Sequence, residues 1–329
     1  MNRREAKPPP PWPAGDTTQI PYWIYSDQSI FEREMDRIFC GSSWAYVGLA
    51  AELPVTGSFL TTNIGTRPVV ICRNRNGELR GFVNRCAHRG VKFCRHRTGT
   101  TKRFTCPYHQ WSYDLNGELR GVPFMRGVNG QGGMPDDFDP GENGLQQLNV
   151  IEHNGVLFAS FVPETVDFVS YLGESNRYYF ERVFDGRELR LLGHSRQLIS
   201  GNWKLMFENI KDPYHASLLH VFLVTFGLFR ADQEAQVKMD ATGGHGLLIS
   251  RKGEQKATEA TQDIANLRED FELKDPRLLD PVKEFKDSAT VVMQTLWPNL
   301  IIQQQSNTIA MRQVQPVDPS SFILAWTFF

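Results

Sequence analysis

Two short Cys/His pairs decide how this chain is interpreted: CAH at residues 86–88 and CPYH at residues 106–109. The pairs are separated by residues 89–105, and a predicted hairpin lies near each of them. Thiolate and imidazole groups in this layout are typical of a metal site, and zinc accepts mixed Cys/His ligands, so a zinc ribbon is one interpretation. The predicted ligands are Cys86, His88, Cys106 and His109.

The spacing favours iron over zinc. A C-x-H pair followed by a C-x-x-H pair resembles the Rieske iron–sulfur motif, in which two cysteines hold one iron and two histidines hold the other. Arg89, Gly90 and Trp111 extend the resemblance to C-x-H-R-G and C-x-x-H-x-W. Cys40, Cys72 and Cys94 match no ligand spacing, and we expect them to be packing residues.

The region around these pairs predicts a small antiparallel β domain. Asn-Gly pairs at residues 76–77, 116–117 and 154–155 each separate two strand-like runs, and Asn-Gly tolerates the positive φ of tight hairpins. We place this domain at residues 44–162. Residues 1–43 before it comprise a Pro-rich extended arm, up to about residue 20, and a helix with a capping box at Ser29 and Glu32 or a cap at Ser26.

A second cluster of possible ligands lies in residues 163–329, which form the third predicted region. Asp212, His215 and His220 occur within a long helix-like stretch from Trp203 to about Phe226. Positions i and i+5 are about 140° apart on an ideal helix, so the two histidines converge only if a turn is widened or broken, and Pro213 is a reason for irregularity. Imidazole ligands suit ferrous iron. Strands are expected around 289–296, 300–315 and 321–329.

Together the two sets of residues resemble the large (alpha) subunit of Rieske non-haem iron aromatic-ring-hydroxylating oxygenases, over nearly the whole chain. The resemblance implies an α+β protein, in which an antiparallel β Rieske [2Fe–2S] domain is followed by a helix-grip-like catalytic α+β domain, with the N-terminal helix packing on the latter.

The resemblance also implies roles for residues. Cys86, His88, Cys106 and His109 match cluster ligands, and His215 and His220 match ligands of a mononuclear Fe(II). Asp212 matches the residue that bridges a cluster histidine of one subunit to an iron histidine of its neighbour.

The third iron ligand is normally an Asp further downstream. No carboxylate after His220 sits in that motif, and the chain stops within the apolar run 325–329. Either the sequence is truncated there or the polypeptide cannot hold the iron tightly, and we leave the ligand unassigned.

The implied reaction uses dioxygen and electrons that come from NADH through a separate reductase or ferredoxin. The chain itself has no Gly-x-Gly-x-x-Gly dinucleotide fingerprint. The family also implies an α3β3 assembly with a small beta subunit.

Segments at 201–205, 211–215, 132–135 and 303–305 look most like oxygenases for aromatic carboxylates, with salicylate 5-hydroxylase first and anthranilate or terephthalate dioxygenases as alternatives. A buried carboxylate needs a cationic partner, for which Arg312 is the candidate. The flanking residues Met206, Phe207, Leu219 and Val221 fit either a pocket lining or a core.

Composition narrows the remaining function classes. Lys and Arg number 36 and Asp and Glu 37, for a net charge of −1, which argues against a nucleic-acid binder. No apolar run reaches the roughly 20 residues of a membrane span, and prolines 8–11 replace the apolar run of a signal peptide, so we expect a cytoplasmic protein. Two interpretations of another class remain, namely a simple Rieske electron carrier and a zinc-stabilised binding module.

Overall fold

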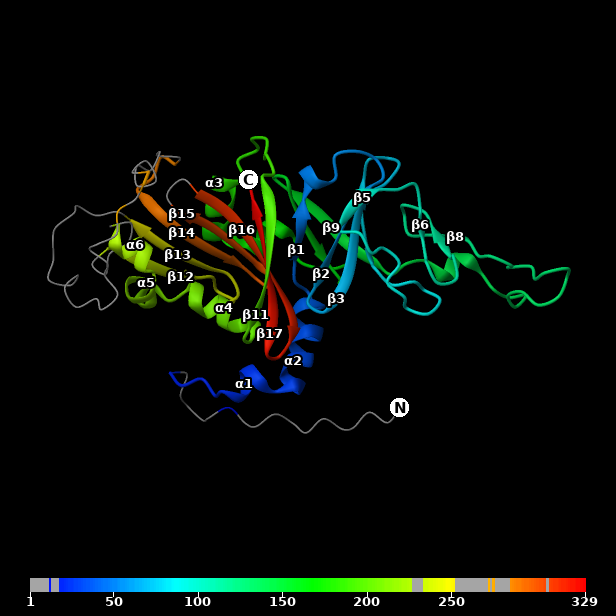
Figure 1. The fold of residues 1–329 in the computed structure, drawn as a ribbon, viewed down its shortest axis with the longest axis horizontal. Coiled ribbons are helices and arrows are strands. Elements are labelled where there is room, and N and C mark those ends of the chain that lie inside the picture. The colour runs from blue at the N-terminus through cyan, green and yellow to red at the C-terminus, as the bar shows by residue number, and fades with distance from the viewer. Residues whose placement is uncertain are drawn as a thin grey trace. The chain divides into compact units, whose positions relative to one another are not determined.

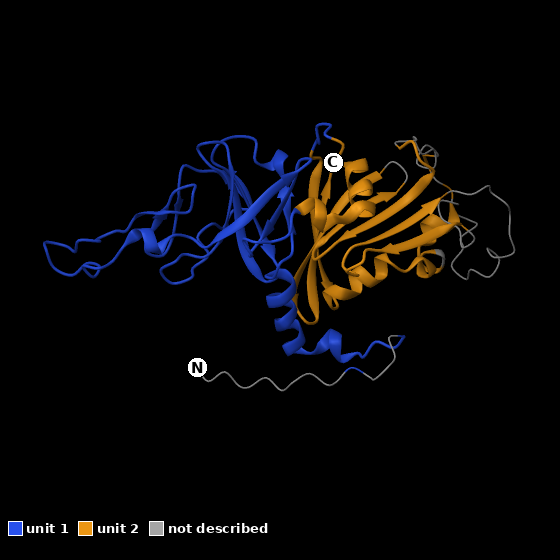
Figure 2. Cartoon of the chain, turned by 180° about the vertical axis from the view of Figure 1, so that it is seen from behind, with its two compact units in different colours: residues 1–167, 186–190 blue, residues 168–185, 191–329 orange. Residues whose placement is uncertain are grey.

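The chain folds into two compact units. The structure is a computed structural model that describes residues 12, 18–226, 233–251, 272, 274–275, 285–305 and 308–329. Unit 1 comprises residues 1–167 and 186–190, and unit 2 comprises residues 168–185 and 191–329 (Figure 2). Most of the predicted Pro-rich arm, residues 1–11 and 13–17, lies outside the described residues.

Unit 1 is built on a seven-stranded antiparallel sheet in the order β1-β10-β9-β4-β3-β2-β5, with a second, three-stranded sheet β6-β7-β8 (Figure 1). The strands of the large sheet are β1 (Ala45–Leu49), β2 (Ser58–Ile64), β3 (Arg67–Arg73), β4 (Leu79–Val83), β5 (Thr98–Thr100), β9 (Gln147–His153) and β10 (Val156–Ser160). The small sheet comprises β6 (Phe104–Thr105), β7 (Ser112–Tyr113) and β8 (Leu119–Gly121), and two 3-10 turns are η2 (Ala50–Glu52) and η3 (Pro140–Asn143).

All three predicted hairpins are confirmed, but they use two different turns. Asn154 and Gly155 both have positive φ, 49° and 82°, which makes the link between β9 and β10 a two-residue hairpin. In the other two turns only the glycine has positive φ. There the side chains of Asn74 and Asp114 accept hydrogen bonds from backbone N–H groups two and four residues ahead, which closes a wider loop.

The N-terminal helical segment contains a cap that the sequence pattern did not identify. It comprises α1 (Trp23–Ser26), α2 (Gln28–Glu34) and the π-helical turn η1 (Met35–Phe39). Asp27 caps α2, because its carboxylate accepts from the backbone N–H groups of Ser29 and Ile30, so the predicted caps at Ser29 and Ser26 are wrong. The carboxylate of Asp27 is charged and reaches both orphan donors at once.

Unit 2 is a seven-stranded antiparallel sheet in the order β11-β17-β16-β15-β14-β13-β12. Its strands are β11 (Gly193–Ser200), β12 (Ala235–Met239), β13 (Gly246–Arg251), β14 (Ala289–Leu296), β15 (Leu300–Gln305), β16 (Thr308–Asp318) and β17 (Ser321–Phe328). The expected run 300–315 is thus two strands, and β11, β12 and β13 had no clear sequence signal. The α+β class, with an antiparallel β domain followed by an α+β domain, is confirmed.

Helices lie on both faces of the unit 2 sheet. On one face is α3 (Phe168–Val183), held by hydrogen bonds from Gln294 to the carbonyl of Asn176 and from Arg182 to Gln304. Because alternate residues of a strand point to opposite faces, Met293 and Gln303 face the other side. That side is covered by α4 (Trp203–Ile210), α5 (Pro213–Leu219) and α6 (Val221–Thr225), which replace the single helical stretch predicted for 203–226.

Candidate metal centres

The two Cys/His pairs of unit 1 lie on loops with the same backbone pattern. In the first loop, Cys86 N–H donates to the carbonyl of Val91, and Gly90 N–H donates back to the carbonyl of Cys86. The second loop repeats this pattern from Cys106. The residue four positions after each cysteine has positive φ, 68° at Gly90 and 58° at Gln110. The two loops therefore present their side chains as a pseudo-symmetric pair.

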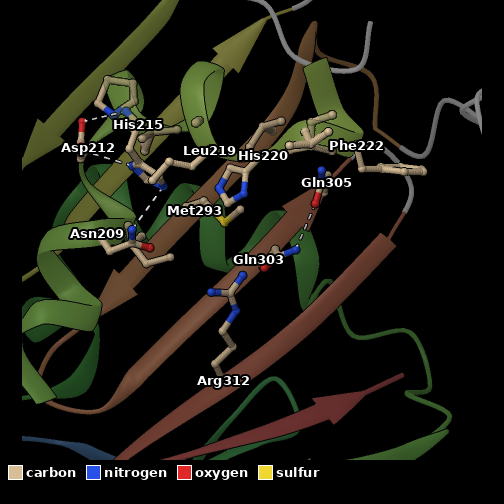
Figure 3. Close-up of a pocket in the computed structure, with 17 residues that line it drawn as sticks. Asn209, Asp212, His215, Leu219, His220, Phe222, Met293, Gln303, Gln305 and Arg312 are labelled. Carbon is tan, nitrogen blue, oxygen red and sulfur yellow. Dashed lines mark hydrogen bonds and ion pairs between the residues drawn. The ribbon is translucent and has the colours of Figure 1, made fainter. Parts of the chain in front are cut away.

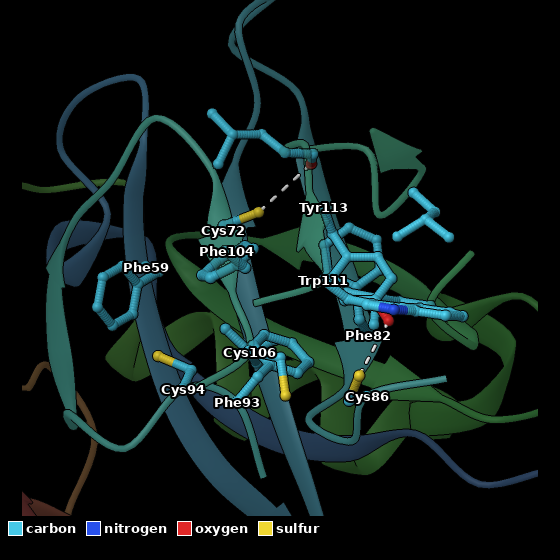
Figure 4. Close-up of a cluster of buried hydrophobic side chains, with 14 residues drawn as sticks. Phe59, Cys72, Phe82, Cys86, Phe93, Cys94, Phe104, Cys106, Trp111 and Tyr113 are labelled. Atoms are coloured by element: carbon cyan, nitrogen blue, oxygen red, sulfur yellow. Dashed lines mark hydrogen bonds between the residues drawn. The ribbon is translucent and has the colours of Figure 1, made fainter. Parts of the chain in front are cut away.

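The cysteines of these loops are buried and the histidines are nearer the surface. Cys86 is 4% exposed and Cys106 is 1% exposed, within an aromatic core that includes Phe82, Phe93 and Tyr113 (Figure 4). All five cysteines of the chain are free, and Cys72 and Cys94 are buried as packing residues, as expected.

The two half-buried histidines face each other. The rings of His88 and His109 lie 4.6 Å apart between centroids, and Trp111 stacks on His88 at 4.8 Å with the planes 11° apart. Nδ1 of His88 is buried and has no hydrogen-bond partner. Burial lowers the pKa of His88, and the charges of His109 and Arg89 lower it further, so the ring is neutral and its lone pair is available to a metal.

A tyrosine that the motif analysis did not single out completes this site. The hydroxyl of Tyr113 lies 3.1 Å from Sγ of Cys86 and accepts from the backbone N–H of Ala87 at 3.1 Å (Figure 4). Burial, followed by the bond to Cys86, raises the pKa of Tyr113, so the phenol keeps its proton, and either the hydroxyl or the thiol can be the donor of the bond between them. A side-chain donor fits a sulfur that carries negative charge, as a cluster-bound thiolate does.

The donor set of unit 1 fits a [2Fe–2S] cluster. Two buried thiols and two imidazoles, one of them with an Nδ1 that makes no hydrogen bond with any described residue, would provide two protein ligands for each iron. Within the described residues, no three His, Cys, Asp or Glu side chains come together around a single point.

In unit 2, the second pair of histidines converges because the helix breaks between α5 and α6. Asp212 caps α5, accepting from the N–H groups of Tyr214 and His215, and Pro213 takes the first helical position, where its missing N–H is not needed. His220 ends α5 with φ −88° and ψ 71°, outside the helical region. The predicted broken turn is therefore at His220 itself, whereas Pro213 begins a helix.

The two rings are placed as ligands of one metal would be. His215 and His220 have their ring centroids 5.1 Å apart (Figure 3). Nδ1 of His215 lies 3.3 Å from Oδ2 of Asp212, and Nε2 lies 3.2 Å from the amide nitrogen of Asn209. The amide nitrogen of Asn209 can only donate, so it occupies the lone pair of Nε2, whereas Nδ1 makes no hydrogen bond with any described residue and lies beside the Asp212 carboxylate. Burial lowers the pKa of His220, and the charges of His215 and Arg312 act in the same direction, which favours the neutral, ligating imidazole.

The histidines open onto a cavity of about 500 Å³ between the short helices and the sheet. Its helical wall includes Asn209, Asp212, His215, Leu219, His220 and Phe222. Its sheet wall includes Leu248, Val291, Met293, Gln303, Gln305 and Arg312 (Figure 3).

Arg312 is a buried cation on the sheet wall of this cavity. It is 9% exposed, its Nε has no hydrogen-bond partner, and its guanidinium lies 4.3 Å from the centre of the Trp326 ring. Trp326 pairs directly with Arg312 across β16 and β17, so both side chains lie on one face of the sheet. Burial lowers the pKa of Arg312 to about 10, which still leaves it charged at neutral pH.

Comparison with known proteins places the chain in a family. The model of the Rieske [2Fe-2S] domain matches residues 43–131, and that of the ring hydroxylating alpha subunit (catalytic domain) matches residues 173–329. The large oxygenase component of salicylate 5-hydroxylase from Ralstonia sp is 46% identical, covering 97% of this chain and 77% of the relative. The anthranilate 1,2-dioxygenase large subunit from Burkholderia cepacia is 42% identical, covering 97% of this chain and 76% of the relative.

The chain belongs to the ring-hydroxylating oxygenase alpha-subunit family. Among solved structures, naphthalene 1,2-dioxygenase from Rhodococcus sp. bound to indole has a TM-score of 0.74 and 26% identity, covering 94% of this chain and 72% of that chain. Membership establishes an enzyme that hydroxylates aromatic rings with oxygen and electron-transfer partners. Its cofactors are a [2Fe–2S] cluster and a mononuclear iron, as predicted. Within the described residues no helix is long and apolar enough to cross a membrane.

Several residues of this oxygenase cavity had only a partial sequence signal. Leu219 and Val221 line it, whereas Phe207 is buried against Trp203 and Trp297, and Met206 is not among the lining residues. Gln303 and Gln305 come from the triple-glutamine segment, in which strand alternation sends the outer two residues to the cavity and Gln304 to the opposite face.

The third iron ligand remains unassigned in this oxygenase. Within the described residues, no carboxylate joins His215 and His220 to complete a group of three potential ligands.

Proposed function

We propose that this oxygenase hydroxylates an aromatic carboxylate, with a salicylate-like acid as first choice. Arg312 carries this proposal, because it is a buried cation in the wall of the cavity and has an unused donor. Desolvating a guanidinium without an anionic partner is unfavourable, and a substrate carboxylate provides that partner. The relatives named for salicylate, anthranilate and terephthalate agree with an acidic substrate and leave the latter two acids as alternatives.

The proposed ligands follow from the two donor sets. Cys86, His88, Cys106 and His109 would hold the cluster, and His215 and His220 would hold the mononuclear iron. When bound, the cluster supplies an electron store and the mononuclear iron supplies dioxygen activation.

The surrounding residues orient and shield these groups. The carboxylate of Asp212 lies 3.3 Å from Nδ1 of His215, and we propose that it links His215 to a cluster histidine of a neighbouring subunit. Phe222 and Met293 give the cavity apolar walls that limit water near an aromatic ring.

We propose the partners of the enzyme from its resemblance to other ring-hydroxylating oxygenases. Electrons come from NADH through a separate reductase or ferredoxin, and the chain joins a small beta subunit in an α3β3 assembly. The cavity with its second pair of histidines argues against a simple electron carrier, which would have no use for either.

Replacing Arg312 with Gln tests the substrate class. Truncating one partner of a buried charge pair costs roughly 2–5 kcal/mol, which is about 30- to several-thousand-fold in affinity. We expect that loss for salicylate, largely independent of salt, and a much smaller one for the uncharged salicylamide. Binding is measured by titration calorimetry. The matched control is Arg196→Gln, which replaces an exposed arginine of β11. Equal losses for acid and amide would show that Arg312 has only a structural role.

A further inference from the structure

The cavity wall contains a second unsatisfied polar atom besides Nε of Arg312. Oε1 of Gln303 is buried and has no hydrogen-bond partner among the described residues. The amide nitrogen of the same side chain donates to Oε1 of Gln305 at 3.3 Å, which orients the amide and leaves its oxygen unused. The wall therefore offers one unused cationic donor and one unused neutral acceptor.

Sheet register places these two groups side by side. Ile301 on β15 pairs with Arg312 on β16, so Gln303 is the diagonal neighbour of Arg312 on the same face. Diagonal neighbours have their Cα atoms about 7–8 Å apart, within reach of two long side chains that converge on one ligand. Both side chains point into the cavity, close to His220 (Figure 3).

The amide nitrogen of Asn209 and the amide oxygen of Gln305 already have partners. The nitrogen of Asn209 lies 3.2 Å from Nε2 of His215, and the oxygen of Gln305 accepts from Gln303. A ligand that binds Arg312 through a carboxylate thus finds one free acceptor beside it, and a buried acceptor left unpaired loses its water without compensation.

We propose that Gln303 determines substrate specificity by accepting a hydrogen bond from a hydroxyl or amino group next to the ring carboxylate. This inference rests on the proposed function, since it places the carboxylate at Arg312. It selects 2-hydroxy- and 2-aminobenzoates over benzoate, which has no second donor. It also disfavours a para dicarboxylate, which has no donor next to either carboxylate.

The wild-type oxygenase provides the first test, by titration with salicylate, anthranilate, benzoate and 2-methoxybenzoate. The methoxy compound keeps the ring oxygen but has no donor proton. We expect salicylate and anthranilate to bind about 5- to 150-fold more tightly than 2-methoxybenzoate. Equal affinity for all four acids would overturn the proposal, without any variant having to fold.

The second test replaces Gln303 with Met, which is of similar length but has no amide oxygen. We expect salicylate and anthranilate to lose the same 5- to 150-fold, while benzoate binding changes by less than about twofold. Gln236→Met, on the exposed strand β12, is the control for the substitution itself. Equal weakening of all acids by Gln303→Met would make Gln303 a general lining residue and overturn the proposal.

The two levels of inference fail separately. If Arg312→Gln weakens salicylate and salicylamide equally, the carboxylate site at Arg312 is wrong. If that variant behaves as expected but Gln303→Met leaves the ratio of salicylate to benzoate affinity unchanged, only the role of Gln303 is wrong.

Discussion

The two metal-binding regions hold their histidines in different ways. In unit 1, each Cys/His pair lies on a loop closed by its own backbone hydrogen bonds, and both cysteines belong to a buried core. In unit 2, both histidines come from one segment, at the start of α5 and at the break that follows it, beside an open cavity. A redox cluster benefits from a rigid site, whereas a site that admits substrate and dioxygen needs an accessible side.

The neighbouring groups differ in the same sense. The cluster loops receive a neutral donor, Tyr113, which is fully buried. His215 has an anionic neighbour, Asp212, whose side chain is 48% exposed. Tyr113 can therefore adjust the charge on a buried sulfur. Asp212, being exposed, can also contact groups outside the chain. Four predictions test this contrast, in order of decreasing effect.

The largest effect is expected from removing a cluster ligand. Cys86→Ser or His109→Ala should abolish the visible absorbance of the cluster and remove its iron, while the mononuclear iron of unit 2 stays bound, because neither a hydroxyl nor a methyl group replaces these ligands. Absorption spectra and iron analysis measure both effects. Cys40→Ser, at a half-buried cysteine outside the loops, should look like wild type. A normal cluster spectrum in either ligand variant contradicts the assignment.

Two substitutions of Asp212 distinguish its role as the cap of α5 from its role beside His215. Asp212→Ala should keep both metals but reduce turnover by about 100-fold, because loss of a group that orients a ligand typically has that effect. It should also destabilise α5 by about 1 kcal/mol, through loss of the cap.

Asp212→Asn is the matched control, since asparagine caps a helix as well as aspartate does. It should restore thermal stability without restoring turnover. Steady-state assays and thermal unfolding separate the two effects, and full activity in Asp212→Asn would show that only capping matters.

Tyr113→Phe should leave the cluster in place and lower its reduction potential by tens of millivolts. With a cluster bound, Cys86 would be a thiolate and the hydroxyl of Tyr113 would be the donor, which favours the more negative, reduced cluster, so losing that donor disfavours reduction. Potentiometric titration measures the shift. Tyr108→Phe, at an exposed tyrosine in the same region, is the control and should not change the potential. Equal reduction potentials in the Tyr113 and Tyr108 variants would show that Tyr113 does not influence the cluster.

The smallest effect concerns backbone strain in the second cluster loop. Gln110 has φ 58° and occupies the position that Gly90 has in the first loop. Gln110→Gly should relieve the strain of the left-handed conformation and raise the free energy of unfolding by between 0 and about 1 kcal/mol. Gln146→Gly, at an exposed residue that lacks positive φ, should instead destabilise by about 0.5–1 kcal/mol. Denaturant unfolding measures whether each variant is stabilised or destabilised. Equal destabilisation by both substitutions would show that Gln110 is not strained.

The sequence determined the features that depend on residues close together in the chain. Cys86, His88, Cys106 and His109 could be grouped because each loop sets its own ligand spacing, and Asn154-Gly155 predicted its hairpin because two adjacent residues fix that turn. The convergence of His215 and His220 was foreseen as a broken turn, although the break was expected at Pro213. Residue patterns of this kind reflect local backbone geometry, which carries over directly from sequence to structure.

The tertiary structure decided which distant residues meet. Tyr113 reaches Cys86 only because β7 folds back beside the first loop, and Arg312 and Gln303 share a wall only because β15 and β16 pair in one register. A shift of one residue in that register would turn either side chain to the opposite face of the sheet. Register is set by packing across the whole sheet, so the sequence supplied the candidate residues and the fold chose their neighbours.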